Sequence, residues 1–257
     1  ISKADIADGG MKSFKQDDDS IILITRDNST YHAFDGKCPH AGADLGTGLR
    51  CGNRVVCPWH HATFDSTDGT LLEPVAIEGL TQYELSDDGD NLIVNTAAKM
   101  DKTVNNDQLN DTHTLIVGGG AAGFMTAHHL RNMGYGGKIS IISKDDKAPY
   151  NRTLLSKAFL AGDMAEEKLL LGGTDWAEKN NIELRLKQTV SQVLPNENSI
   201  IINDDDSNKK LSPDFLVIAT GSEPTIPPIT GAKQKGVFTL RSMDDAKAIK
   251  AASHNKK

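Results

Sequence analysis

The chain has 257 residues, of which 38% are hydrophobic, and it carries a formal net charge of −7 at pH 7. This length suits about two domains, and Lys and Arg form no cluster larger than a pair, which disfavours nucleic-acid binding. The sequence contains no run of about eighteen apolar residues, so no membrane span is predicted, and no signal peptide is evident. Because the sequence begins at Ile1 rather than Met, we expect the native N-terminus and any targeting segment to lie outside it.

Residues 1–95 are predicted to form an all-β domain. Apolar runs at 21–26 and 31–34 flank a short polar turn, and runs at 83–85 and 91–94 flank a second turn rich in Asp and Gly. Both arrangements are hairpin signals. Short strands separated by such turns favour a small sandwich or barrel.

Two short segments of this region each carry one cysteine and one histidine. Residues 38–40 read Cys-Pro-His and residues 57–60 read Cys-Pro-Trp-His. A Rieske [2Fe–2S] centre needs this mixed set, with two Cys on one iron and two His on the other. The short gaps place each Cys and its His on one tight loop, and the prolines stiffen both loops by fixing φ. The predicted cluster ligands are Cys38, His40, Cys57 and His60.

A structural zinc site is the alternative for the same residues. Cys₂His₂ zinc sites usually carry both cysteines on one loop and both histidines on the other, whereas here each loop carries one of each. The third cysteine, Cys51, has no thiol partner, which favours a reducing compartment, and we expect it to be buried or half-buried. We predict a cytoplasmic location, with a mitochondrial location as the alternative.

Residues 96–111 are polar and lack apolar periodicity, so they are predicted to be a linker. After them, an apolar strand at 114–117 leads into a glycine-rich turn at 118–123, a helix reaching Met133 and a second strand at 138–143. This βαβ unit predicts a parallel sheet. We interpret residues 112–257 as an α/β Rossmann-like domain that binds a dinucleotide.

The glycine-rich turn is the predicted phosphate site. Gly118, Gly120 and Gly123 fit the pattern G-x-G-x-x-G, with Ala121 and Ala122 between them. The first glycine permits the tight turn, the second lets the backbone approach a pyrophosphate, and the third lets the helix pack close to the strand. The N-terminus of the helix adds free N–H groups and partial positive charge.

An acidic residue after the second strand is expected to bind a ribose hydroxyl. Lys144 stands where this acid would first be sought, and Asp145 and then Asp146 follow it. We choose Asp145 as the ribose-binding residue, with Asp146 as the next choice. A solvated turn is an equally good reading of either aspartate.

Two later segments favour FAD as the dinucleotide. Residues 149–157 resemble the P-Y-x-R-x-x-L-S-K segment of FAD-dependent pyridine-nucleotide reductases, and residues 216–224 resemble their strand that ends in A-T-G. The resemblance implies that Arg152 neutralises a phosphate and that Lys157, the candidate catalytic residue, lies near the isoalloxazine ring. It also implies FAD contacts at Val190, Ala219, Thr220 and Gly221.

Taken together, the two halves resemble the AIF-like oxidoreductases, which are Rieske–FAD fusions related to apoptosis-inducing factor. Residues 57–64 are similar to their second cluster loop, and residues 240–246 to the approach to their NADH-binding unit. That unit carries a second G-x-G-x-x-G, which this sequence lacks. We therefore expect a multi-domain fragment, an all-β Rieske domain followed by an incomplete FAD-binding domain.

The resemblance implies that the complete enzyme passes electrons from NAD(P)H through FAD to the [2Fe–2S] cluster, and on to an external protein or small molecule. Two alternatives stay open. One is a Rieske electron-carrier module with a non-catalytic flavin-like scaffold, and the other is a redox-linked apoptosis signalling protein.

Overall fold

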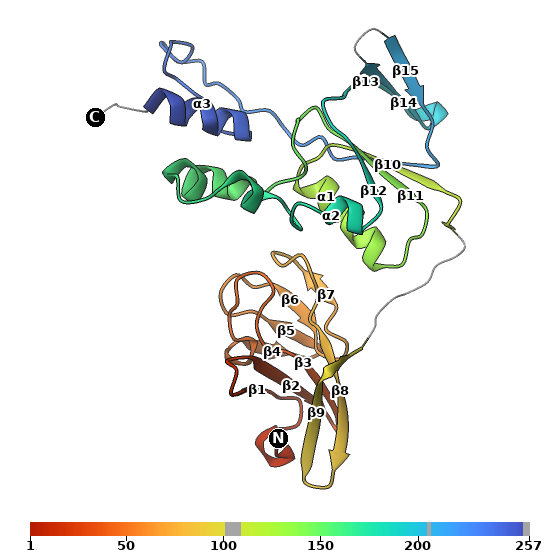
Figure 1. The fold of residues 1–257 in the computed structure, drawn as a ribbon, viewed down its shortest axis with the longest axis vertical. Coiled ribbons are helices and arrows are strands. Elements are labelled where there is room, and N and C mark those ends of the chain that lie inside the picture. The colour runs from red at the N-terminus through yellow and green to blue at the C-terminus, as the bar shows by residue number, and fades with distance from the viewer. Residues whose placement is uncertain (101–108, 205–206, 254–257) are drawn as a thin grey trace. The chain divides into compact units, whose positions relative to one another are not determined.

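The computed structural model describes residues 1–100, 109–204 and 207–253. The chain divides into two units, Ile1–Lys102 and Thr103–Lys257 (Figure 1). Half of the segment expected to be a linker, 96–111, lies outside the described residues. Its first residues are not linker, because the last strand of the first unit, β9, continues to Lys99.

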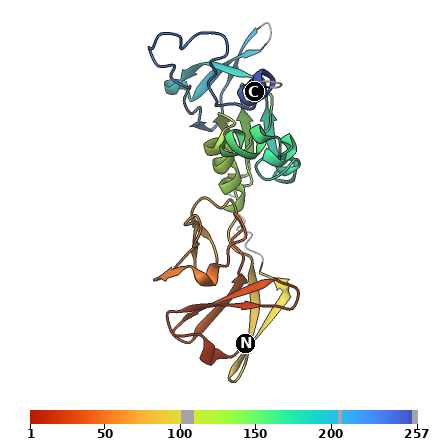
Figure 2. The ribbon, with the colours of Figure 1, turned by 90° about the vertical axis from the view of Figure 1, so that its left-hand side faces the viewer.

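The first unit consists of two antiparallel sheets. The larger has the strand order β1-β2-β3-β8-β9, and the smaller has the order β4-β5-β6-β7. Figure 2 shows the smaller sheet as a lobe separate from the larger one. The larger sheet contains β1 (Met11–Lys15), β2 (Ile21–Asp27), β3 (Thr30–Asp35), β8 (Gln82–Asp88) and β9 (Asn91–Lys99). The smaller contains β4 (Leu49–Cys51), β5 (Arg54–Val56), β6 (Thr63–Asp65) and β7 (Leu71–Glu73).

The core of this unit lies on both faces of the larger sheet, because consecutive apolar residues of β2 are buried and contribute to two separate clusters. In the β2–β3 hairpin Leu23 lies opposite Phe34, and both are fully buried. They join one cluster with Val55 and Phe64 of the smaller sheet. Each fully buried side chain of this size contributes about 1.5–3 kcal/mol, so this cluster helps to hold the two sheets together.

A buried arginine adds a polar attachment at the same place. Arg50 of β4 donates hydrogen bonds to the carbonyl oxygens of Gly10 and Arg26, at 2.6 and 2.7 Å, and pairs with Asp27 at 2.5 Å. Its side chain is only 5% exposed. The guanidinium of Arg50, which belongs to the smaller sheet, therefore satisfies backbone carbonyl oxygens at the larger sheet.

The second unit is built on a parallel sheet of order β12-β11-β10-β16. The strands are β10 (His113–Val117), β11 (Lys138–Ile142), β12 (Ile182–Arg185) and β16 (Phe215–Ile218). A second, antiparallel sheet contains β13 (Thr189–Leu194), β14 (Ser199–Asp204) and β15 (Ser207–Leu211). Ile200 and Ile202 of β14 pack on Leu115, Val117 and Ile142 of the parallel sheet, so this sheet covers one of its faces.

Helix α1 (Ala121–Asn132) follows β10 and buries Phe124, Ala127 and His128, which lie on one helical face. It ends in a Schellman motif. The N–H of Gly134, at φ 78°, donates to the carbonyl of Arg131, and the N–H of Tyr135 donates to that of Leu130. Glycine is favoured there because this left-handed position penalises a Cβ.

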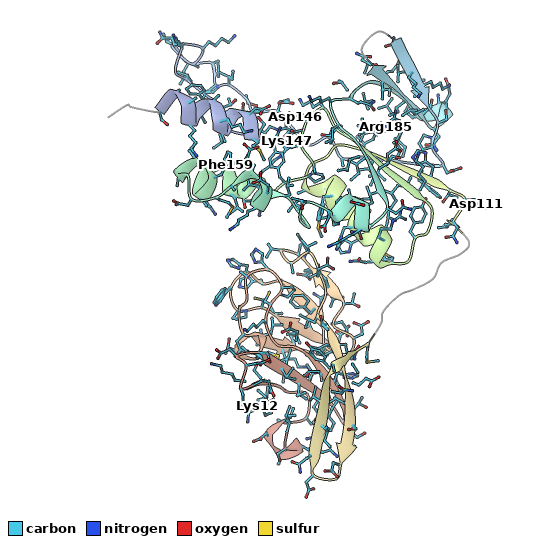
Figure 3. The ribbon with its side chains drawn as sticks, viewed as in Figure 1. Lys12, Asp111, Asp146, Lys147, Phe159 and Arg185 are labelled. Atoms are coloured by element: carbon cyan, nitrogen blue, oxygen red, sulfur yellow. The ribbon has the colours of Figure 1, made fainter. Side chains whose placement is uncertain are left out.

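The described residues of the second unit also form α2 (Trp176–Lys179) and α3 (Met243–Ser253), with shorter helical turns at Arg152–Leu154, Leu155–Phe159, Glu166–Leu169 and Pro195–Glu197. Met243 and Ala246 of α3 are buried in one cluster with Phe159 (Figure 3). No helix in the described part of the chain is long and apolar enough to cross a membrane.

Candidate cluster and cofactor sites

The two cysteine–histidine segments fold as loops with the same backbone hydrogen bonds. In each loop the cysteine N–H donates to the carbonyl five residues later, Cys38 to Ala43 at 2.8 Å and Cys57 to Ala62 at 2.9 Å. The cysteine carbonyl accepts from the N–H four residues later, which belongs to Gly42 in one loop and His61 in the other. Two separate stretches of chain therefore adopt one local geometry.

The residue four positions after each cysteine has a positive φ. Gly42 has φ 80° and His61 has φ 61°. A glycine takes this conformation without strain, whereas a residue with a Cβ is destabilised by roughly 1–2 kcal/mol. His61 is exposed, so its strained backbone belongs to the turn rather than to packing of its side chain.

The four predicted ligands lie together, with sulfur inside and nitrogen outside. Cys38 and Cys57 are 2% and 1% exposed, and both are free thiols in mutual contact. His40 and His60 are exposed, and their ring centroids are 4.7 Å apart with the planes at 81°. Burial, followed by contact with the other thiol, raises the pKa of the Cys38 thiol.

This arrangement fits a two-iron cluster. The two thiols can share one iron and the two imidazoles the other. Among residues 1–100, 109–204 and 207–253, no group of three or more His, Cys, Asp or Glu side chains is arranged to hold one metal ion. The contact of thiol with thiol and of imidazole with imidazole fits a [2Fe–2S] cluster, which takes two Cys on one iron and two His on the other.

Cys51 does not belong to the site, and the expectation that it would be buried was wrong. It is exposed at the end of β4, opposite Arg54 in the hairpin to β5. The intervening Gly52 has φ 58°, so the chain reverses immediately after Cys51 and leaves it at the tip of the smaller sheet.

The second unit contains a cavity of about 1260 Å³ at the carboxyl ends of its central strands. Segments that follow β10, β11 and β16 line it, together with the start of β13 and the segment that leads into α3. Parallel strands end at the same edge of a sheet, which is where ligands bind in open α/β folds. The predicted residues that line the cavity are Gly118, Gly120, Ala121, Ala122, Asp145, Arg152, Val190, Ala219, Thr220 and Gly221.

The three glycines of the motif occupy different environments. A Cβ on Gly118, whose φ is 120°, would lie 2.2 Å from the carbonyl oxygen of Ala219. A Cβ on Gly123 would lie 1.9 Å from the carbonyl oxygen of Gly118, so this glycine permits α1 to pack on the turn. A Cβ on Gly120 would meet no atom within 4 Å, which leaves its backbone open toward the cavity.

Lys157, the candidate catalytic residue, does not line this cavity. Its side chain is exposed, and its backbone has φ −120° and ψ −115° inside a π-helical turn, Leu155–Phe159. Its neighbours Leu155 and Phe159 are buried against α3. The motif that contains it is therefore split, because Arg152 lies on the cavity wall and Lys157 lies away from it.

Asp145 lines the cavity, but both of its carboxylate oxygens already accept hydrogen bonds. One accepts from the N–H of Lys147 at 3.1 Å, and the other accepts from the hydroxyl of Tyr150 at 2.9 Å. The Tyr150 oxygen in turn accepts from the N–H of Met243 at 3.0 Å. Burial raises the pKa of Tyr150 to about 12. This chain of contacts attaches the loop after β11 to the start of α3.

Sequence analysis did not assign a role to three charged residues of the wall. Lys144 follows β11, Glu223 follows β16, and Arg241 precedes α3. Lys144 forms an ion pair with Glu223, and Arg241 lies 3.5 Å from the same carboxylate oxygen. The hydrogen bond from Lys144, and then the charge of Arg241, lowers the pKa of Glu223. Lys144 and Glu223 could have been found from their positions shortly after two strands that end at one edge of the sheet, whereas Arg241 lies ahead of a helix and carries no such signal.

The start of α3 holds Arg241 at this edge through a capping box. The side chain of Asp245 accepts hydrogen bonds from the N–H groups of Arg241 and Ser242, at 2.9 and 2.8 Å. The Ser242 hydroxyl accepts from the N–H of Asp245 at 3.1 Å. Such reciprocal bonds satisfy otherwise unpaired N–H groups at the beginning of a helix.

Two family models match the chain. The model described as pyridine nucleotide-disulphide oxidoreductase matches residues 112–257, and the model described as Rieske [2Fe-2S] domain matches residues 1–84. The first covers more than half of the chain, and the second covers both cysteine–histidine loops.

Relatives match either both units or the second alone. The human protein named apoptosis-inducing factor 3 is 30% identical over 89% of this chain and 39% of its own length. The ferredoxin–NAD(+) reductase subunit of a benzene 1,2-dioxygenase system, from Pseudomonas putida, is 37% identical over 54% of this chain and 33% of its own length. The chain therefore spans about two fifths or less of these relatives.

A solved structure is similar to the second unit in fold and in sequence. The covalent putidaredoxin reductase–putidaredoxin complex has a TM-score of 0.50 and 31% identity, and the match covers 55% of this chain and 34% of that chain.

Proposed function

Because the chain belongs to the pyridine nucleotide-disulphide oxidoreductase family and carries a Rieske [2Fe–2S] domain ahead of that region, we propose that it transfers electrons from NAD(P)H, through FAD and then a Rieske cluster, to an external acceptor. The observation that carries the proposal is the presence of two suitable sites in one chain. One is a pair of loops with two buried thiols and two exposed imidazoles, and the other is a cavity above a glycine-rich turn.

FAD, when bound, supplies the exchange between a two-electron donor and a one-electron carrier. The N–H groups at the start of α1 and the open backbone at Gly120 are suited to its pyrophosphate. Arg152 and Arg241 lie on the same wall and would balance the charge of the phosphates. Val190, at the start of β13, is proposed to contact the adenine through its backbone. Lys157 is proposed to act near the isoalloxazine ring, although it lies outside the cavity lining.

The cluster loops suggest where an acceptor approaches. Cys38 and Cys57 are buried, whereas His40 and His60 are exposed. An outside protein or small molecule can therefore come closest on the imidazole side. Two of the similar proteins are named as reductases, one of ferredoxin and one of putidaredoxin. By these names, each reductase acts on a redox protein that is a separate molecule. We propose that the Rieske domain of this chain occupies the corresponding place as an attached acceptor.

The decisive experiment is spectroscopic and uses the full chain purified without oxygen. Broad iron–sulfur absorption together with flavin peaks is the expected visible spectrum, with about two irons and one FAD per chain. Reducing the protein should produce the electron paramagnetic resonance signal of a reduced Rieske cluster. A colourless protein that contains zinc would overturn the proposal.

Matched variants test the assignment of the ligands. Cys57→Ser and His60→Ala should lose iron and colour, because each removes one ligand. Cys51→Ser and His61→Ala are the controls, since these residues are exposed and Cys51 lies outside the loops. Retention of iron in His60→Ala would contradict the assignment. Iron–sulfur bands without flavin would instead favour a carrier module with a non-catalytic scaffold.

A further inference from the structure

The strand end that usually supplies a ribose-binding acid carries a lysine in this chain. Strand β11 ends at Ile142, and Ser143 and Lys144 follow it on the cavity wall. An acid in this region of a dinucleotide-binding unit accepts a hydrogen bond from a ribose hydroxyl. A lysine ammonium has three donors and no acceptor. The acceptor for the ribose must therefore come from another part of the wall.

The two aspartates that follow Lys144 are engaged within their own loop. Asp145 accepts hydrogen bonds from the Lys147 N–H and the Tyr150 hydroxyl, one on each oxygen. Asp146 pairs with the side chain of Lys147 at 2.8 Å (Figure 3). Redirecting Asp145 toward a ligand would break the attachment of this loop to the start of α3. Asp145 is therefore a poor acceptor, and Asp146 is oriented by a single ion pair, whereas two cations orient Glu223.

Glu223 reaches the same wall from the opposite side. It follows β16, which lies on the other side of β10 from β11. Its ion pair with Lys144 therefore crosses the end of β10, where the glycine-rich turn begins. Lys144 and Arg241 both contact Oε1 of Glu223. The side chain is 66% exposed, so Oε2 can accept a hydrogen bond from a ligand.

We propose that Glu223, held by Lys144 and Arg241, accepts a hydrogen bond from a ribose hydroxyl of the adenosine half of FAD. It takes the place of the acid that the strand end lacks. Lys144 then acts as a positioning residue, because it orients the carboxylate rather than the ribose. This inference depends on the proposed function, since it assumes that the cavity binds FAD.

The ion pairs of Glu223 with Lys144 and Arg241 have an alternative effect, which would weaken FAD binding instead of strengthening it. Glu223 could compete with the pyrophosphate for Lys144 and Arg241, in which case its removal would strengthen FAD binding. A ribose acceptor predicts the reverse, because a hydrogen bond from the ribose to a charged carboxylate strengthens binding. The direction of the change in affinity therefore separates the two roles.

The experiment measures binding to the full chain after its flavin has been removed. FAD is titrated by the quenching of its fluorescence, and ADP, 2′-deoxy-ADP and 3′-deoxy-ADP are tested as competitors. Glu223→Gln should weaken FAD and ADP binding roughly tenfold. It should also reduce the preference for ADP over one of the deoxy analogues, because an amide oxygen accepts a weaker hydrogen bond than a carboxylate. The urea midpoint should not change, since the pair is exposed.

A charge relocation and a matched control complete the test. The double variant Lys144→Asp with Glu223→Gln restores an acid at the strand end and should recover the preference for ADP. Glu197→Gln is the control, because Glu197 pairs with Lys210 at similar exposure and does not line the cavity.

The outcomes distinguish this inference from the proposed function. If the unaltered chain does not bind FAD, the proposed function fails first. If it binds FAD and Glu223→Gln binds FAD and ADP equally well or more tightly, the inference alone is overturned.

Discussion

The cluster loops and the dinucleotide cavity are built in opposite ways. Each cluster loop is local, since a cysteine, its histidine and the residue that turns the chain lie within five positions, and two loops repeat one hydrogen-bond pattern. The cavity is assembled from segments as distant in sequence as Gly118 and Arg241. A local site is specified by spacing, whereas an assembled site depends on the order of strands in the sheet.

This contrast predicts that the two sites can be lost separately. Cys38→Ser should abolish iron binding, because the serine hydroxyl is a poor replacement for a thiolate on iron, while FAD affinity should stay within about twofold. Iron analysis and FAD titration on the same protein provide the measurement. Loss of FAD together with iron would show that the cavity depends on the cluster.

The second prediction concerns the sheet that supports the cluster loops. Arg50→Ala removes a nearly buried cation that pairs with Asp27 and satisfies carbonyls of the larger sheet. We expect a loss of about 4 kcal/mol in the free energy of unfolding of the first unit. Lys12→Ala is the control, because its ion pair with Asp5 is exposed, and its effect should stay below about 0.5 kcal/mol. Equal urea midpoints for both variants would refute the role of Arg50.

The third prediction compares two glycines of the nucleotide turn. Gly123→Ala places a methyl group against the carbonyl of Gly118 and should destabilise the second unit by about 3 kcal/mol. Gly120→Ala adds a methyl group in open space, so stability should barely change while FAD affinity falls. Thermal unfolding and FAD titration measure the two effects. An identical stability loss in both variants would contradict the proposed division of roles.

The fourth prediction follows from the buried tyrosine beside the cavity. Because burial raises the pKa of Tyr150 from 10.0 to about 12, the unfolded chain loses this proton at lower pH than the folded chain. Protonated Tyr150 therefore contributes about 2 kcal/mol to the free energy of unfolding. This contribution is complete below pH 10 and is lost as the pH rises toward about 12. Tyr150→Phe should flatten the stability curve in that window. Urea unfolding at several pH values measures it, and parallel curves would count against the prediction.

The smallest expected effect returns to the cluster loops. Gly42 and His61 occupy equivalent positions with positive φ, and only His61 carries a Cβ. His61→Gly should therefore stabilise the first unit by about 1 kcal/mol without loss of iron. Gly42→Ala should destabilise it by a similar amount. A destabilising effect of His61→Gly would mean that the side chain of His61 makes a favourable contact.

Sequence reasoning succeeded where the relevant residues are neighbours in the chain. The predicted fold class, an antiparallel β Rieske domain followed by an α/β domain with a parallel sheet, is confirmed by the strand pairing and the family matches. The resemblance to the AIF-like oxidoreductases is confirmed as well. The assignment of individual site residues stays a prediction, although the structure brings Cys38, His40, Cys57 and His60 together and gathers most of the predicted FAD contacts on one wall.

By itself, the sequence determined the cysteine–histidine loops, the βαβ unit and the glycine turn, because spacing over a few residues sets their backbone geometry. Only the tertiary structure decided that Cys51 is exposed, that Lys157 lies off the cavity wall, and that Glu223 meets Lys144. The physical reason is strand order. Since β11 and β16 flank β10, side chains about eighty positions apart share one edge of the sheet.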